Sequence, residues 1–157
     1  MSRKVFLDAN VVLRILFGEP AELAEHAFRA VVRLREEGAR LILPGIALAE
    51  VVWTLERRAK VARVDIAAEL LDFLTAFGIA VEDRVWLEAL ALYGERNVPF
   101  GDAVLATAVQ AAADAQLLSF DEEFDRLPVR RLRPEELSTQ AVGEPGPARH
   151  RKPRRRG

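Results

Sequence analysis

The stretch Val5-Phe6-Leu7-Asp8-Ala9-Asn10 contains the pattern that decides the fold: a short apolar strand, one carboxylate and the first residues of a helix. Further mostly apolar runs of strand length occur at residues 40–43, 79–81 and 117–120, and residues 129–132 are a candidate edge strand. Between these runs apolar residues recur at helical spacing, which is typical of helices that pack on one side. The alternation predicts an α/β protein, a three-layer α/β/α sandwich whose central, mostly parallel sheet has about five short strands.

Six helices are expected around these strands. Their predicted ranges are residues 10–17, 20–37, 44–58, 65–77, 83–97 and 102–113. Asp65 is predicted to cap the fourth helix, because an aspartate at the N-cap accepts hydrogen bonds from free backbone N–H groups. The fifth helix is predicted to begin at Asp83. Asp102 is predicted to open the sixth helix.

The chain has 157 residues, enough for one domain with a hydrophobic core, which we place at residues 1–134. Residues 135–157 combine glycine and proline with many arginines, and this composition predicts a disordered basic tail. The sequence has no cysteine, which excludes disulfides and thiolate metal sites and favours a reducing compartment. No apolar stretch reaches the roughly 18 residues of a membrane helix and no signal-peptide pattern is present, so we expect a cytoplasmic protein without membrane contact.

The net charge of −1 hides an asymmetry between the body and the tail. Residues 141–157 hold six of the 23 basic residues and one of the 24 acidic residues. Residues 1–140 therefore carry 17 basic and 23 acidic groups, a net charge of −6. Such a body has no general attraction for nucleic acid, so RNA binding would need a local source of positive charge such as a divalent cation.

Single carboxylates interrupt the most apolar parts of the sequence. Asp8, Glu50 and Asp102 are each the only charged residue in residues 5–13, 41–55 and 98–113, and Asp121 directly follows an apolar strand. Because a lone buried carboxylate is unfavourable, we expect Glu50 to point into the interior or into a cleft. Ligand sites of open parallel sheets gather at the carboxyl ends of the strands, so we expect all four acids to converge at one edge.

Converging carboxylates repel one another unless protons or cations intervene. A set of oxygen ligands without histidine or cysteine suits Mg²⁺ or Mn²⁺. Divalent ions held by acids are typical of enzymes that cleave phosphate esters. The pattern therefore predicts a metal-dependent enzyme that acts on phosphate esters.

Each acid also has a local explanation. Asp102 would stabilise a helix N-terminus, Asp8 would suit a turn after a strand, and Glu50 would need a buried ion pair, for example with an arginine. The position of Asp121 is shared with a cluster of acids that could form a solvated face: Glu122, Glu123 and Asp125. The joint pattern of isolated acids in the most apolar stretches favours the metal site.

With these residues in place, the chain resembles PIN-domain ribonucleases, and most of all the VapC-type toxins of type II toxin–antitoxin systems. The resemblance covers residues 4 to about 133 and rests on the order and spacing of four short segments: Val5-Phe6-Leu7-Asp8-Ala9-Asn10, Leu48-Ala49-Glu50-Val51, Phe100-Gly101-Asp102-Ala103 and Leu118-Ser119-Phe120-Asp121.

This resemblance implies both a site and partners. Asp8, Glu50 and Asp102 would be the main acids that bind Mg²⁺ or Mn²⁺, and Asp121 would be the fourth, with Asp125 as its competitor. Polar positions that orient such a site are matched by Asn10 and Ser119. The implied substrate is single-stranded or structured RNA, and the implied protein partners are a cognate antitoxin and a second copy in a homodimer.

Other enzyme classes fit less well. A haloacid-dehalogenase-type phosphatase needs a second aspartate where this chain has Asn10, and a receiver domain needs a lysine in a region with none between Lys60 and Lys152. A dinucleotide-binding fold needs a glycine-rich loop after the first strand, which is absent. The non-enzymatic alternative is an RNA-binding or scaffolding module that uses the basic tail.

Overall fold

Three parallel strands form the main sheet. A computed structural model of the chain describes residues 2–138. Strands β1 (Lys4–Phe6), β2 (Arg40–Leu43) and β3 (Ala80–Val81) pair in the order β1-β2-β3. In this register Val5 lies opposite Leu41 and Ile42 lies opposite Ala80. All side chains of β2 after Arg40 are buried, because the strand is central and helices cover both faces.

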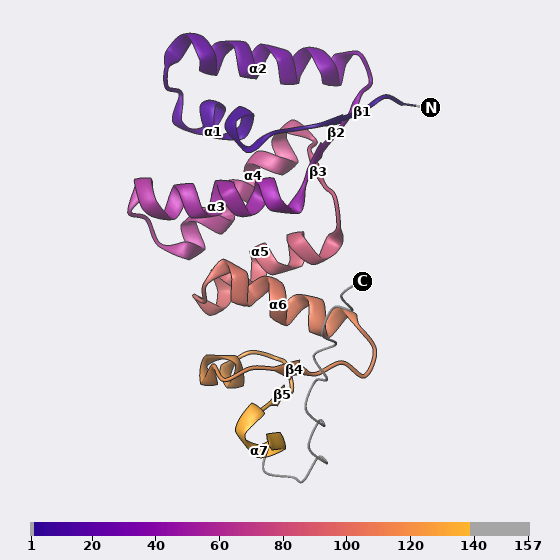
Figure 1. Cartoon of the computed structure of the whole chain (residues 1–157). Coiled ribbons are helices and arrows are strands. Elements are labelled where there is room, and N and C mark those ends of the chain that lie inside the picture. The colour runs from indigo at the N-terminus through magenta and orange to yellow at the C-terminus, as the bar shows by residue number, and fades with distance from the viewer. Residues whose placement is uncertain (1, 139–157) are drawn as a thin grey trace, which may run out of the picture.

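Helices cover the main sheet on both sides, which confirms the α/β/α sandwich (Figure 1). One layer consists of α1 (Ala9–Phe17) and α2 (Ala21–Glu36), and the other begins with α3 (Gly45–Ala59) and α4 (Arg63–Phe77). Two further helices pack against this second layer: α5 (Arg84–Arg96) against α4, and α6 (Phe100–Ala111) against α3.

The last two strands form a sheet of their own, so the prediction of one five-stranded sheet is wrong. Strands β4 (Leu117–Leu118) and β5 (Arg131–Leu132) pair in parallel with each other, and neither joins the main sheet. The 3₁₀ helix η1 (Glu122–Arg126) lies between them, and the short helix α7 (Pro134–Ser138) follows. The separation leaves apolar side chains on both sheets in solvent: Phe6 is 61% and Leu118 is 59% exposed.

Most predicted helix boundaries agree with the structure within two residues. Asp83 is the N-cap of α5, and its carboxylate accepts a 2.9 Å hydrogen bond from the Val85 amide. Asp65 does not cap α4, which begins at Arg63 after Ala62. Helix α6 also begins earlier than predicted, after Pro99, because the fixed φ of proline suits a helix entry.

The turn from β2 into α3 is held by a close contact with α5. A Cβ on Gly45 would lie 1.9 Å from Cε2 of Trp86, so only glycine lets the indole pack there. The Gly45 amide also donates a 2.9 Å hydrogen bond to Glu82 Oε2. These two contacts fix the start of the helix that carries Glu50.

Pro134–Ser138 is helical, whereas the remainder of the tail predicted from residue 135, residues 139–157, lies outside the described residues. Within residues 2–138, no helix combines the length and hydrophobicity needed to span a membrane.

Candidate active site

Asp8 lies where the first strand passes into the first helix. The ladder with β2 continues to Leu7, whose amide donates a 2.8 Å hydrogen bond to the Ile42 carbonyl. Asp8 has extended backbone angles, is exposed, and accepts a 2.8 Å hydrogen bond from the Ala9 amide as the N-cap of α1. Asn10 is also exposed. Strand and cap together fix the Asp8 backbone at the carboxyl end of β1.

Glu50 lies on the outer side of α3, which corrects the expectation that it points into the interior or a cleft. The apolar residues around it are buried, whereas Glu50 itself is exposed: Ala47, Leu48, Ala49, Val51 and Val52. Helix α3 packs against α1, α4 and α6, so most of its circumference is covered. The residues around Glu50 are uncharged because they are packed against these helices. Glu50 lies on the part of the α3 surface that is exposed to solvent.

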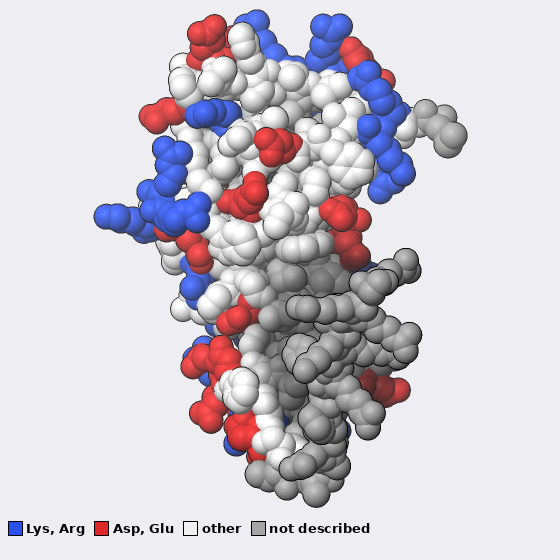
Figure 2. Space-filling view, in the orientation of Figure 1, with Lys and Arg blue, Asp and Glu red and all other residues white. Residues whose placement is uncertain are grey.

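Helix α3 lies between the elements that carry two other predicted site residues. It contacts α1, which begins after Asp8, and α6, which carries Asp102. Figure 2 shows separate acidic side chains over α1 and α3, within an otherwise uncharged part of this face. The packing therefore places Asp8, Glu50 and Asp102 on three neighbouring helices.

Asp102 is the third residue of α6 and is half-buried. Burial raises the pKa of its carboxyl group, and the negative charges of Asp121 and Glu123 raise it further. The positive charge of Arg63 acts in the opposite direction. Asp102 and Asp121, more than fifteen residues apart in the chain, thus lie within electrostatic range of each other.

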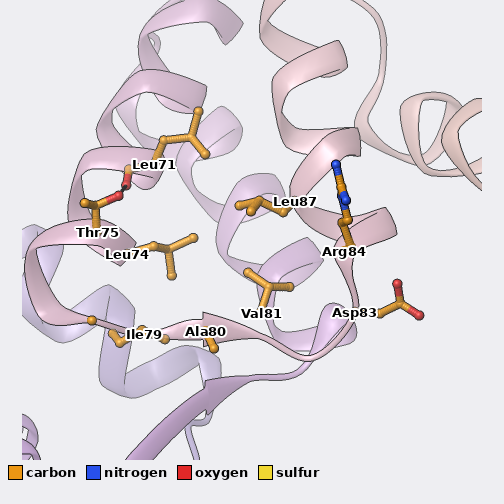
Figure 3. A pocket seen from close by; sticks show the side chains of 10 residues that line it. Leu71, Leu74, Thr75, Ile79, Ala80, Val81, Asp83, Arg84 and Leu87 are labelled. Atoms are coloured by element: carbon orange, nitrogen blue, oxygen red, sulfur yellow. Dashed lines mark hydrogen bonds between the residues drawn. The ribbon is translucent and has the colours of Figure 1, made fainter.

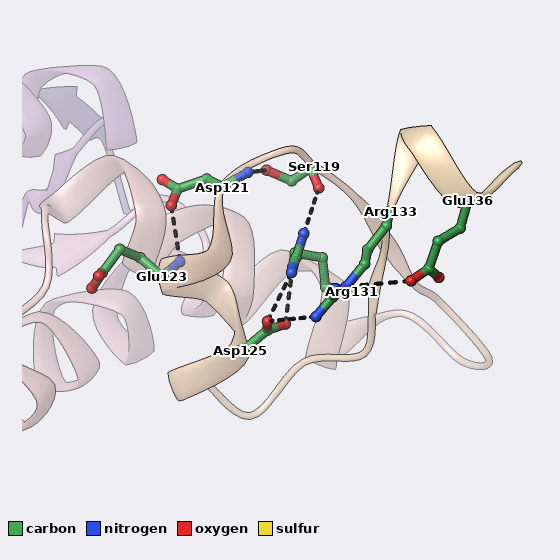
Figure 4. A network of polar contacts seen from close by, with 7 residues as sticks. All are labelled: Ser119, Asp121, Glu123, Asp125, Arg131, Arg133 and Glu136. Atoms are coloured by element: carbon green, nitrogen blue, oxygen red, sulfur yellow. Dashed lines mark hydrogen bonds and ion pairs between the residues drawn. The ribbon is translucent and has the colours of Figure 1, made fainter. Parts of the chain in front are cut away.

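Asp121 is fixed by hydrogen bonds at the start of η1 (Figure 4). Its carboxylate accepts a 2.9 Å hydrogen bond from the Glu123 amide, and its own amide donates a 3.0 Å hydrogen bond to the Ser119 hydroxyl oxygen. Ser119 was predicted as an orienting residue, and its hydroxyl does contact the backbone of Asp121. The turn after β4 is thereby held in one conformation.

Asp125, the competitor of Asp121, is engaged by arginines. Arg131 donates two hydrogen bonds to its carboxylate, at 2.9 and 2.7 Å, and Arg133 lies 3.6 Å from it (Figure 4). The hydrogen bond from Arg131 lowers the pKa of Asp125. Arg131 also donates a 3.0 Å hydrogen bond to the Ser119 carbonyl. Asp125 therefore stabilises the β4–β5 unit, and its oxygens are already occupied.

The four acids have the donor chemistry of a divalent-cation site, but the expected convergence of all four is not seen: within residues 2–138 they are not brought together as ligands of one ion. All are carboxylates, and the negative charge that raises the pKa of Asp102 is charge that a cation would neutralise. Among residues 2–138, no three histidine, aspartate or glutamate side chains lie close enough together to hold a metal ion. Mg²⁺ commonly uses only one or two carboxylates together with water and substrate phosphates, so the donor set fits an open site of this kind.

The sequence offered Glu123 only as a candidate for a solvated acidic face, and it did not indicate that Arg63 lies near Asp102. Glu123 and Arg63 both act on its charge. Arg63 also donates to Glu56 Oε1 at 2.9 Å, and the buried Tyr93 hydroxyl donates to the same oxygen at 3.0 Å. Nothing in the local pattern around Arg63 distinguishes it from other surface arginines, because its role depends on the packing of α4 against α5.

A cavity in the described part of the chain lies away from the four predicted site acids. A hollow of about 530 Å³ opens between α4, β3 and α5, and Figure 3 shows that most of the side chains lining it are apolar. Asp83 is its only acid, and this carboxylate caps α5. None of the four predicted site acids lines it. The candidate active site is therefore an open surface between helices.

Comparison with known proteins agrees with this geometry. Residues 5–130 match the model of the PIN domain. The chain belongs to the PIN-domain family. This VapC-like chain is also 29% identical over 133 residues to the VapC ribonuclease of Aquifex aeolicus (strain VF5), an alignment that covers 84% of this chain and 98% of the relative. No solved structure matches the chain significantly.

Asp102→Asn is expected to stabilise the metal-free protein at neutral pH. A raised folded-state pKa means that the native state binds this proton more tightly than the unfolded state. The stability linked to Asp102 is thus fully present below its ordinary pKa and is lost as the pH rises through the folded value. Asparagine removes this loss. Thermal unfolding in EDTA should give a higher midpoint for the variant at pH 7.5 and a smaller difference at pH 4; a lower midpoint at pH 7.5 would contradict the expectation.

Proposed function

We propose that this PIN-domain protein is a divalent-metal-dependent endoribonuclease, which hydrolyses RNA phosphodiester bonds and acts as the toxin of a toxin–antitoxin pair. The observation that carries the proposal is the placement of Asp8 at the start of α1, Glu50 on α3 and Asp102 on α6, with α3 packed against both other helices. The chain is also similar to a VapC ribonuclease over 84% of its length. Asp121, within electrostatic range of Asp102, supplies the fourth acid.

Asp102 and Asp121 are the pair best suited to share a cation. The negative charge of Asp121 opposes the charged form of Asp102, and a positive ion beside the two carboxylates would relieve this repulsion. Glu50 and Asp8 would complete the oxygen set from the neighbouring helices. Asp125 is a weaker choice for the fourth acid, because Arg131 and Arg133 already neutralise it.

In the proposed reaction the cation and the protein chain make different contributions. When bound, Mg²⁺ or Mn²⁺ supplies Lewis acidity that polarises a phosphate oxygen and activates water. The chain supplies position: the cap at Asp8 and the hydrogen bonds from Glu123 and to Ser119 at Asp121 hold the carboxylates in place. The open surface around the acids admits a long strand, whereas an enclosed pocket would admit only a small ester.

The partners follow from the same proposal. The substrate is single-stranded or structured RNA, the regulator is a cognate antitoxin protein, and the working form is a homodimer. A chain without cysteine suits the reducing cytoplasm, where such RNA is found.

Metal removal provides the direct test. Purified protein is expected to cleave a labelled single-stranded RNA in Mg²⁺ or Mn²⁺ and to lose this activity completely in EDTA, with recovery on addition of excess Mg²⁺. Cleavage is measured as the appearance of shorter products on a denaturing gel. Activity that is indifferent to EDTA would overturn the metal-dependent mechanism.

The non-enzymatic alternative makes the opposite prediction. An RNA-binding module would leave the RNA intact in every metal and would lose its affinity when residues 141–157 are removed. A nuclease should retain metal-dependent cleavage after that truncation. Assays of the full chain and of the form lacking residues 141–157 therefore distinguish the nuclease from the RNA-binding module.

A further inference from the structure

Four cations gather where helices α1 and α3 end. Arg14 lies in the last turn of α1, Arg57 and Arg58 lie in the last turn of α3, and Lys60 is the C-cap residue of α3. We call these four residues the helix-end patch. Arg14 is half-buried and the other three are exposed. Figure 2 shows blue side chains gathered at the left edge of the molecule, where these two helices end.

The two helix ends are in direct contact and form a hollow. The guanidinium carbon of Arg58 lies 4.8 Å from the centroid of the Phe17 ring. The hollow has a volume of about 430 Å³ and is lined by five residues: Arg14, Phe17, Glu19, Pro20 and Arg58. Stacking on Phe17 limits the motion of the Arg58 guanidinium, which leaves its edge available for a bidentate contact with a phosphate.

The patch is not used for ion pairs within the protein. None of its four side chains is paired with an acid within residues 2–138. Arg14 donates to the Glu19 carbonyl oxygen at 3.1 Å, and Arg57 donates to Thr54 Oγ1 at 3.3 Å. Both acceptors are uncharged, so these contacts orient the guanidinium groups without neutralising them.

Cations at helix C-termini have an ordinary role, which is to compensate the helix dipole. Two C-termini carry about half a negative charge each, and Glu19 adds one full negative charge at the hollow. Four cations exceed this total, so the patch retains a net charge of about +2. Dipole compensation alone does not account for its size, particularly in a body whose net charge is negative.

The patch and the proposed active-site acids occupy the same pair of helices. Glu50 and Arg57 are seven residues apart on α3, and Asp8 and Arg14 are six residues apart along α1. At a rise of 1.5 Å per residue these separations are about 11 Å and about 9 Å. Arg63, three residues after Lys60, also donates a 3.0 Å hydrogen bond to the Asn97 carbonyl in the loop that leads to α6 and Asp102. One RNA strand can therefore reach both groups.

We propose that the helix-end patch binds backbone phosphates of the RNA strand next to the bond that is cut. This inference rests on the proposed ribonuclease function and explains how an acidic body holds a polyanion. Phosphate contacts of this kind position the strand without reading its sequence. An acidic protein segment would be attracted by the same charge, but the position of the patch on the two helices that carry Asp8 and Glu50 favours the substrate.

The test compares RNA binding by the full chain and by an Arg14→Gln/Arg58→Gln variant. Binding of a fluorescein-labelled single-stranded RNA is measured by anisotropy in EDTA at several salt concentrations, and a denaturing gel verifies that the RNA is intact. The variant is expected to bind about 10-fold more weakly at 0.1 M salt. The slope of log K against log salt should fall by about 1.4, because each phosphate contact with a single strand contributes about 0.7.

A matched control removes the same charge elsewhere. Lys4 and Arg40 are exposed register partners at the start of β1 and β2, and Lys4→Gln/Arg40→Gln should leave the slope unchanged. An Arg14→Lys/Arg58→Lys variant keeps the charge and should retain most of the slope. Equal thermal midpoints establish that the variants are folded, and all variants keep residues 139–157, so any contribution of the tail is common to them.

The outcomes separate this inference from the proposed function. Equal slopes for the Arg14/Arg58 variant and the Lys4/Arg40 control would overturn the inference, and so would unchanged RNA affinity together with lost binding to an acidic protein. A reduced slope in a protein that never cleaves RNA would support the patch while contradicting the nuclease.

Discussion

Replacing Asp102 by asparagine is expected to lower the rate of RNA cleavage by more than about 100-fold while the fold is kept. Residues that merely support metal ligands change activity by about 10–100-fold when replaced, so loss of a ligand charge should have a larger effect. A bound cation would stabilise the charged form of Asp102, which burial and two neighbouring acids oppose. The measurement is the initial rate of cleavage of a labelled single-stranded RNA in Mg²⁺.

A matched substitution shows whether the effect belongs to the site. Asp114 is exposed, and its φ of 55° lies in the left-handed region that asparagine also tolerates. Asp114→Asn changes the charge by the same amount and should leave the rate within about twofold of the unmodified protein. A rate for Asp102→Asn that equals the Asp114→Asn rate would remove Asp102 from the proposed machinery. The combination of lost activity and higher metal-free stability is the specific signature expected of Asp102.

Leu43→Ala is expected to lower the free energy of unfolding by about 3 kcal/mol, within the range of leucine-to-alanine substitutions in protein cores. Leu43 is the last residue of the central strand, is fully buried, and lies opposite Val81 on β3. Removal of its isobutyl group leaves a cavity that two layers of helices cannot close easily. The midpoint of thermal unfolding should fall by roughly 6–12 °C, measured by circular dichroism.

Leu118→Ala serves as the control for Leu43→Ala. Both are strand leucines, but Leu118 lies in the small β4–β5 sheet and is 59% exposed. Its truncation should lower the free energy of unfolding by less than about 1 kcal/mol. A large loss at Leu118 would mean that the side chain is covered in solution, and a small loss at Leu43 would mean that the central strand is not the core of the fold.

The elements of the fold were predictable from local pattern, whereas the pairing of the strands was not. The apolar run at residues 40–43 is a strand with the predicted bounds, and Asp83 caps a helix because its neighbours offer free amides. The runs at residues 117–120 and 129–132 shorten to two-residue strands that pair with each other. Nothing in an apolar run specifies its partner, because the pairing depends on how α5 and α6 pack between the two sheets.

For the candidate site, too, some features were predictable from the sequence and others depend on contacts in the folded chain. The isolated acid in an apolar segment predicted a site role for Glu50, and the expectation that its side chain points into the interior or a cleft was wrong, because its neighbours are buried and Glu50 is exposed. The competition between Asp121 and Asp125 could not be resolved from sequence either. It depends on Arg131 and Arg133, which reach back from β5 to neutralise Asp125. The position of an acid within an apolar segment predicts that it is a candidate site residue. Contacts in the folded chain determine whether its carboxylate remains free of ion pairs.

The separation of the two sheets has a consequence for how copies of this protein meet. Within the described residues, β1 has a strand on one side only, and an unpaired strand edge is a template for a strand from another molecule. Two features limit this edge-to-edge aggregation: β1 has three residues, and Lys4 places a charge at its start. Short length and lysine are common protections of sheet edges. Lys4, which makes no ion pair within residues 2–138, thus places a repulsive charge at an edge where a second copy could otherwise add a strand.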